Sequence, residues 1–173
     1  VILSLNAPHI VRAAVFGQGG VAEGTAPGTL IIDMSSIDPE ATKALASDAA
    51  TKGLRWVDSP LSGGIPKAAT GQLTLMQGGD QADVAEAQQV LANVASNQTR
   101  MGGPGAGQTT KLINQVLCGL SFLAVAEATA LADAAGQHEG DLAVLHLLVL
   151  SHVSAQGERV HPRAGDLGAR DIG

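Results

Sequence analysis

Residues 102–115 read GGPGAGQTTKLINQ, and this stretch decides how the rest of the chain is interpreted. Its glycine-rich part leads directly into an apolar run without proline, which predicts the start of a long helix. Lys111, Asn114 and Gln115 stand at spacings i, i+3 and i+4, so they share one face of that helix. The segment therefore predicts an ammonium group and two amides close to a helix N-terminus, whose field favours a bound anion.

Residues 58–71 read DSPLSGGIPKAATG and are typical of a strand end that breaks into a glycine turn. Ser62 supplies a hydroxyl, and the two glycines after it leave backbone N–H groups open to an anion. Donors of this kind suit a carboxylate, and a lysine beside the reacting oxygen suits proton transfer. Together the two segments predict a site for a small hydroxy-carboxylate.

Residues 33–39, DMSSIDP, complete a set of three motifs. In order and spacing these motifs resemble those of the β-hydroxyacid dehydrogenases, a family that includes 3-hydroxyisobutyrate dehydrogenase and 2-hydroxy-3-oxopropionate reductase. They are similar to its D-x-S-T-x-x-P segment, its D-A-P-V-S-G-G substrate segment and its G-x-x-G-x-G-x-x-x-K-x-x-N-N catalytic segment. The resemblance covers about residues 1–136. One such motif is weak evidence, but three in register are specific.

The resemblance implies an oxidoreductase that uses NAD or NADP. Its implied substrate is a small 3-hydroxy acid or semialdehyde, of the 3-hydroxyisobutyrate or 2-hydroxy-3-oxopropionate type. The catalytic proton is assigned to Lys111. The implied substrate-binding residues are Ser62, Gly63, Gly64, Asn114 and Gln115. The implied cofactor-binding residues are Leu5, Asn6, Ala7, Ser35 and Ser36.

The chain also departs from the family pattern. The nucleotide domain of the family opens with a strand and a G-x-G-x-x-G turn that holds the pyrophosphate. Here the glycines of residues 17–20 follow a helix-like run instead. We therefore expect the first mononucleotide-binding half to be missing from this chain. Gln115 replaces the second Asn of the catalytic segment, as in the 2-hydroxy-3-oxopropionate reductase branch, and Ser36 replaces a Thr but keeps the hydroxyl.

The hydrophobic pattern predicts an α/β fold. Strands are expected at 1–5, 29–32, 55–57 and 73–76, and helices at 8–16, 39–52 and 81–92. Residues 17–28 are rich in glycine and predict a loop. Such alternation indicates a partial Rossmann-type, doubly wound sheet over residues 1–106. A long linking helix over 109–135, expected to be buried on more than one side, would begin a partial all-helical domain over 107–173.

Composition narrows the function classes. The net charge of −6 and the absence of a basic cluster argue against a nucleic-acid partner. The most apolar stretch, 142–150, is too short to span a bilayer, so no membrane partner is expected. The five histidines have no spacing typical of a metal site. The single cysteine, Cys118, is expected to be packed in the core, and a reducing cytoplasm is the expected location. A homo-oligomer is expected for the intact protein.

Two alternatives stay open from the sequence alone. The first is a non-catalytic relative that keeps the fold as an interaction or dimerisation module. The second is a truncated product that no longer folds by itself, since a half sheet leaves an unpaired edge. The presence of Lys111 favours an enzyme over the first alternative. The sequence leaves the substrate, the choice between NAD and NADP and the oligomeric state undecided.

Overall fold

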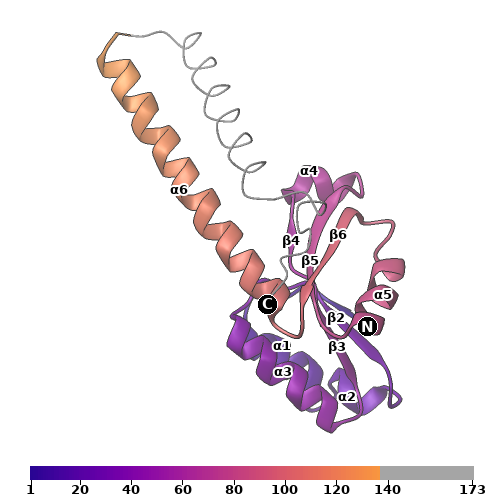
Figure 1. Cartoon of the computed structure of the whole chain (residues 1–173). Helices are drawn as coiled ribbons and strands as arrows, with labels where there is room; N and C mark the ends of the chain where they lie inside the picture. Colours follow the sequence, from indigo (N-terminus) through magenta and orange to yellow (C-terminus); the bar gives the residue numbers. More distant parts are fainter. Residues whose placement is uncertain (137–173) are drawn as a thin grey trace, which may run out of the picture. The chain divides into compact units, whose positions relative to one another are not determined.

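The computed structural model describes residues 1–136 (Figure 1). Its strands are β1 (Ile2–Leu3), β2 (Leu30–Asp33), β3 (Arg55–Asp58), β4 (Leu61–Ser62), β5 (Leu73–Gly78) and β6 (Ala95–Gly102). Its helices are α1 (Pro8–Phe16), α2 (Val21–Gly24), α3 (Pro39–Thr51), α4 (Gly64–Ala69), α5 (Gln81–Val90) and α6 (Ala106–Ala134). The apolar stretch at 142–150 and most of the predicted second domain lie outside the described residues.

The first three strands form a parallel sheet in chain order. Ile31 pairs with Trp56, and Ile32 pairs with Val57. Because side chains alternate along a strand, these two pairs point to opposite faces of the sheet. Both faces are apolar and both are covered, which explains why the strands read as continuous hydrophobic runs rather than as alternating ones. The sequence pattern therefore located these strands to within one or two residues at most of their ends.

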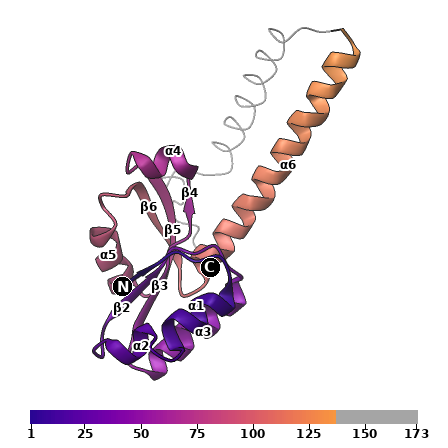
Figure 2. The same cartoon turned by 180° about the vertical axis from the view of Figure 1, so that it is seen from behind.

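Helices cover the two faces of the sheet (Figures 1 and 2). On one face α1 and α3 contribute Val11, Val15 and Leu45 to a core that also contains Ile31 and Trp56. On the other face α5 packs its own apolar residues against the opposite side chains of β2 and β3. This arrangement confirms the predicted α/β, Rossmann-type layout.

The second part of the sheet is mixed. β5 runs antiparallel to β3 and meets it where Asp58 lies opposite Gly78. β4 pairs antiparallel with β5, and β6 pairs parallel with it. The sequence did not predict β4, β6, α2 or α4. β6 reads ASNQTRMG, and most of its residues are exposed. Its sequence therefore lacks the apolar alternation that would predict a strand. It is identified as a strand by its backbone pairing with β5.

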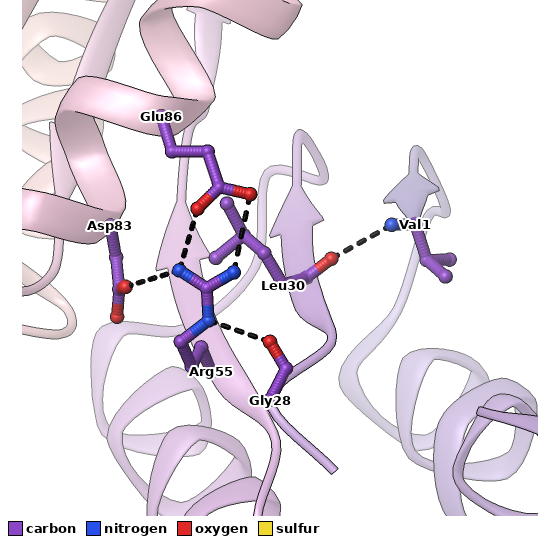
Figure 3. Close-up of polar contacts among 6 residues, drawn as sticks. All are labelled: Val1, Gly28, Leu30, Arg55, Asp83 and Glu86. Atoms are coloured by element: carbon purple, nitrogen blue, oxygen red, sulfur yellow. Dashed lines mark hydrogen bonds and ion pairs between the residues drawn. The ribbon is translucent and has the colours of Figure 1, made fainter. Parts of the chain in front are cut away.

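Arg55, at the beginning of β3, forms ion pairs with two carboxylates of α5 (Figure 3). Its guanidinium lies 2.8 Å from an Asp83 oxygen and 2.7 Å from a Glu86 oxygen, and its Nε donates to the Gly28 carbonyl. The Val1 nitrogen donates to the Leu30 carbonyl at 2.7 Å on the neighbouring strand. These polar contacts lie at the amino ends of the strands, so the carboxyl ends are left for the candidate site.

The chain divides into two compact units, Val1–Leu117 and Cys118–Gly173, and each is described by itself. The predicted domain boundary at residue 106 stays a prediction. The expectation that the long helix is buried on more than one side is wrong for the described residues. The following apolar side chains of α6 are more than half exposed: Leu112, Ile113, Val116, Leu117, Leu120, Phe122, Leu123 and Leu131. Cys118 is exposed as well, contrary to the predicted core position.

Among residues 1–136, α6 alone is long and apolar enough by length and composition to cross a membrane. This differs from the sequence analysis, which considered only the shorter stretch at 142–150. Long core helices of globular proteins satisfy the same test, so the observation does not place the chain in a membrane.

Candidate functional site

Asp58 joins the end of β3 to the beginning of α6. Its Oδ1 accepts the Gly105 N–H at 2.7 Å, and its Oδ2 accepts the Gln108 N–H at 3.0 Å. The first N–H groups of a helix have no partner within the helix, and a carboxylate there satisfies them and complements the helix dipole. Asp58 is fully buried, so this contact fixes where the helix begins relative to the sheet.

Two glycines make this close approach possible. A Cβ at Gly107 would lie 2.7 Å from Asp58 Oδ2 and would also collide with the Met76 carbonyl. A Cβ at Gly78 would lie 2.5 Å from Asp58 Oδ1. Gly107 of the catalytic segment and Gly78 of β5 therefore serve close packing between the helix and the sheet, and neither has a positive φ.

A second buried carboxyl group lies beside Asp58. Asp33 is its partner in the parallel register of β2 and β3, and both side chains are fully buried. Burial raises the pKa of Asp58 to about 6, while the N–H groups of Gly105 and Gln108 oppose that rise. Burial also raises the pKa of Asp33, against a hydrogen bond with Ser35. The carboxyl ends of these two strands therefore carry groups that titrate above the ordinary range of aspartate.

Gln108 connects α6 to the loop that follows β2 by two side-chain hydrogen bonds. Its Oε1 accepts the Ile37 N–H at 3.2 Å, and its Nε2 donates to the Ser35 carbonyl at 2.6 Å. The side chain is 2% exposed, and both groups of the amide are paired. Sequence reasoning missed this residue, although it stands one helical turn before Lys111 in the glycine-rich segment.

The two predicted cofactor serines have different environments. Ser35 is buried, and its Oγ accepts the Leu5 N–H at 2.9 Å. Ser36 is exposed. Among the strand-end residues predicted for the same role, Asn6 is exposed, whereas Leu5 and Ala7 are half-buried. The structure thus gives Ser35 an internal contact and leaves Ser36 and Asn6 accessible near the carboxyl ends of β1 and β2.

The catalytic segment continues along α6. Lys111 Nζ donates to Gln115 Oε1 at 2.9 Å, which confirms the expected common helix face of these two side chains. The Nδ2 of Asn114 is buried and has no hydrogen-bond partner among the described residues. A buried amide donor left unpaired is costly, so this nitrogen is a candidate for pairing with a bound ligand.

The predicted carboxylate-binding turn follows β4. Ser62 pairs in register with Thr74 of β5. Gly63 and Gly64 have φ values of +128° and +64°, conformations that residues with a Cβ rarely adopt. Lys67 packs over this turn, since a Cβ at Gly63 would lie 2.8 Å from the Lys67 Cβ.

The hydrogen bonds bring together the three sequence motifs. Asp58 connects the substrate segment to the catalytic segment, and Gln108 connects the catalytic segment to the loop at 35–37. Ser59 N–H completes the junction by donating to the Asp33 carbonyl at 2.7 Å. Among the described residues, no hydrogen bond joins the turn at 62–64 directly to Lys111, Asn114 or Gln115.

Comparison with known proteins agrees with this organisation. Residues 1–103 match the family described as the NAD binding domain of 6-phosphogluconate dehydrogenase. The chain is 38% identical over 131 residues to 2-(hydroxymethyl)glutarate dehydrogenase of Eubacterium barkeri, covering 76% of this chain and 44% of that protein. It is 40% identical over 130 residues to L-threonate dehydrogenase of Cupriavidus necator, covering 75% and 43%. The chain thus spans less than half the length of these curated relatives.

A solved structure shows the same fold. The 3-hydroxyisobutyrate dehydrogenase of Mycobacterium tuberculosis, determined with L-serine, has a TM-score of 0.74 and 32% sequence identity. The match covers 80% of this chain and 47% of that one. The predicted resemblance to hydroxyacid dehydrogenases is confirmed: this chain belongs to the family defined by the NAD binding domain of 6-phosphogluconate dehydrogenase.

Proposed function

We propose that this chain carries the substrate and catalytic segments of an oxidoreductase that transfers a hydride between NAD(P) and a small 3-hydroxy acid. The observation that supports this most directly is the hydrogen-bonded junction of the three motifs at Asp58 and Gln108. It places the start of the lysine-bearing helix at the carboxyl ends of parallel strands, where ligands of open α/β sheets bind.

The residues present fit the nicotinamide end of the cofactor. Ser36 and Asn6 are exposed at strand carboxyl ends, and the Gln108 amide holds the loop that carries Ser36. The bound cofactor would supply the hydride acceptor or donor. The glycines at 17–20 follow α1 rather than a strand, so they do not form the usual pyrophosphate turn. We therefore assign this chain contacts with the nicotinamide end, and either NAD or NADP satisfies them.

Lys111 would handle the proton of the reaction. In oxidation its Nζ accepts the proton of the substrate hydroxyl, and in reduction it returns that proton to the carbonyl oxygen. Gln115, which accepts from Lys111 Nζ, would keep the amine oriented along the helix face. Asn114 would donate its unpaired Nδ2 hydrogen to a substrate oxygen. Ser62 and the N–H groups of Gly63 and Gly64 would bind the carboxylate.

The relatives support the substrate class. They are named for 2-(hydroxymethyl)glutarate, L-threonate and 3-hydroxyisobutyrate. All three are hydroxy-carboxylates, which is the chemistry expected from a hydroxyl, two glycines and a lysine. We propose a substrate of the 3-hydroxyisobutyrate or 2-hydroxy-3-oxopropionate type. For the protein itself we propose a cytoplasmic location and a domain boundary at about residue 106.

A homo-oligomer is also proposed. The support is the row of exposed apolar side chains on α6, among them Leu120, Phe122 and Leu123, which would contact water in a monomer. Sedimentation velocity of the purified chain tests this. A single monomeric species at all concentrations would contradict it.

The substrate assignment is tested by ligand-observed NMR on the full chain. 3-Hydroxyisobutyrate should give saturation transfer that Ser62→Ala weakens, and its methyl ester should give much less. The reaction is then tested by adding 3-hydroxyisobutyrate with an excess of NAD or NADP and measuring the fluorescence of the NADH or NADPH that forms. Equal signals from the acid and the ester would show that the protein does not recognise the carboxylate.

A further inference from the structure

Gln108 is the point where the catalytic helix contacts the loop after β2. Three hydrogen bonds originate from this one residue: its backbone N–H donates to Asp58, its Nε2 to the Ser35 carbonyl, and its Oε1 accepts from Ile37 N–H. The side-chain bonds span 73 and 71 residues of sequence. They therefore depend on how α6 is placed relative to the loop after β2, and not on the local geometry of the helix.

The amide is buried and its two polar groups are oriented by their partners. Nε2 must face the Ser35 carbonyl and Oε1 must face the Ile37 N–H, so the side chain has one acceptable orientation. The other hydrogen bonds of the loop lie before Ile37: Ser35 N–H donates to Asp33, and Met34 N–H donates to the Leu3 carbonyl. The Ile37 side chain packs against the core that includes Ile31. Among the described residues, Gln108 is the hydrogen-bond partner of the Ile37 N–H.

Lys111 stands one helical turn after Gln108. Residues at i and i+3 are neighbours on a helix surface, so a rotation or shift of the first turn moves both side chains together. On the other side of the contact, Ser36 lies between the two residues that Gln108 binds. One buried amide thus fixes the loop proposed to contact the nicotinamide relative to the lysine proposed to move the proton.

We propose that Gln108 is a positioning residue that couples the loop at 35–37 to the turn of α6 that carries Lys111. This inference rests on the proposed function for its catalytic consequence. Its structural part, the coupling itself, can be measured without any reaction.

The experiment uses the full 173-residue chain and three variants. Gln108→Met keeps the length of the side chain but removes both hydrogen bonds. Gln98→Met is the matched control, because Gln98 also makes two side-chain bonds, to the Gln88 carbonyl and to Gln77, away from this loop. Gln108→Glu is the third, since a protonated carboxyl group can donate and accept as the amide does, whereas the ionised form cannot donate.

The first measurement is hydrogen exchange of the Ile37 amide by NMR, as a protection factor relative to wild type at each pH. Loss of its partner should lower protection in Gln108→Met roughly tenfold to a hundredfold. Protection of Met34 N–H and the Gln98→Met variant should stay close to wild type. With its carboxyl group protonated at low pH, Gln108→Glu can make both side-chain bonds, so its Ile37 protection there should be close to that of wild type. A uniform loss across β2 and α6, or Ile37 protection in Gln108→Glu at low pH as weak as in Gln108→Met, would overturn the coupling.

The second measurement is the affinity for reduced nicotinamide mononucleotide, which contains only the end of the cofactor assigned to this chain. Gln108→Met should weaken it about tenfold, and Gln98→Met should not. If wild type fails to bind this probe, the nicotinamide assignment in the proposed function is wrong, while the exchange data still decide the coupling. If wild type binds and Gln108→Met binds equally well, the coupling has no role at the cofactor site and the proposal fails.

Discussion

The buried carboxylate of Asp58 accepts the backbone N–H of Gln108, 50 residues further along the chain, at 3.0 Å. This contact connects the last residue of β3 to the first turn of α6. Because Asp58 also begins the segment that leads to Ser62, one carboxyl group relates the proposed carboxylate-binding turn to the proposed catalytic helix.

Lys111→Ala should lower turnover by about 10²–10⁴-fold with little effect on folding, because general acid–base groups typically contribute that much. The measurement is steady-state oxidation of 3-hydroxyisobutyrate by this chain fused behind a strand and turn of the G-x-G-x-x-G type. Lys52→Ala, at the exposed C-terminus of α3, is the control. Activity within a few-fold of the parent would remove Lys111 from the mechanism.

Ser62→Ala should raise KM more than it lowers kcat in the same fusion, because the hydroxyl is proposed to bind a carboxylate that does not react. Kinetics with 3-hydroxyisobutyrate and with an uncharged analogue provide the comparison. The loss should be concentrated on the charged substrate. Equal losses on both substrates would show that Ser62 only shapes the turn.

Gly107→Ala should destabilise the chain by about 1–3 kcal/mol, the usual effect of overpacking. The new methyl group would collide with the Met76 carbonyl and lie 2.7 Å from Asp58 Oδ2. Gly103→Ala is the matched control, since a Cβ there meets nothing within 4 Å. Urea unfolding of both variants gives the comparison, and equal stabilities would contradict the close packing of α6 on β5.

The pH dependence of stability should carry the signature of Asp58. Its folded pKa is raised from 3.8 to about 6, so the folded state keeps this proton to higher pH than the unfolded state. Its effect is therefore a loss of stability as the pH rises from about 4 to about 6, of at most about 3 kcal/mol. Asp33, whose pKa is also raised, acts in the same direction.

Urea unfolding at several pH values tests this sign. Asp58→Asn should flatten the slope between about pH 4 and 6, whatever its effect on absolute stability. Asp48→Asn, in an exposed ion pair with Arg12, should leave the slope nearly unchanged. An Asp58→Asn slope equal to that of wild type would show that the carboxyl group titrates at an ordinary pKa.

The chain as given should bind NADH and NADPH weakly. The G-x-G-x-x-G turn that normally holds the pyrophosphate does not occur after any strand of residues 1–136, so only the proposed contacts with the nicotinamide end would hold the cofactor. Isothermal titration calorimetry with both dinucleotides measures this. Micromolar affinity for either would mean that another segment, such as the glycines at 17–20, or a partner chain provides a phosphate site.

Local chemistry explains what could be predicted from the sequence. Apolar runs predicted the strands found at 30–33 and 55–58, and the helix predicted over 39–52 does begin at Pro39, where Asp38 accepts the Ala41 N–H. The motif order predicted the family and the candidate site residues. β6 could not be predicted in this way, because its polar, exposed sequence has no periodicity and only pairing with β5 makes it a strand.

The sequence by itself determined the α/β class, the positions of the main helices and the residue types of the site. Only the tertiary structure decided that Ser35 is buried while Ser36 is exposed, and that Gln108, which none of the quoted motifs specifies, connects the catalytic segment to the loop at 35–37. The physical reason is sequence distance. Bonds between groups about 50 or 70 residues apart exist only once the sheet register and helix packing bring Asp58, Ser35 and Gln108 together.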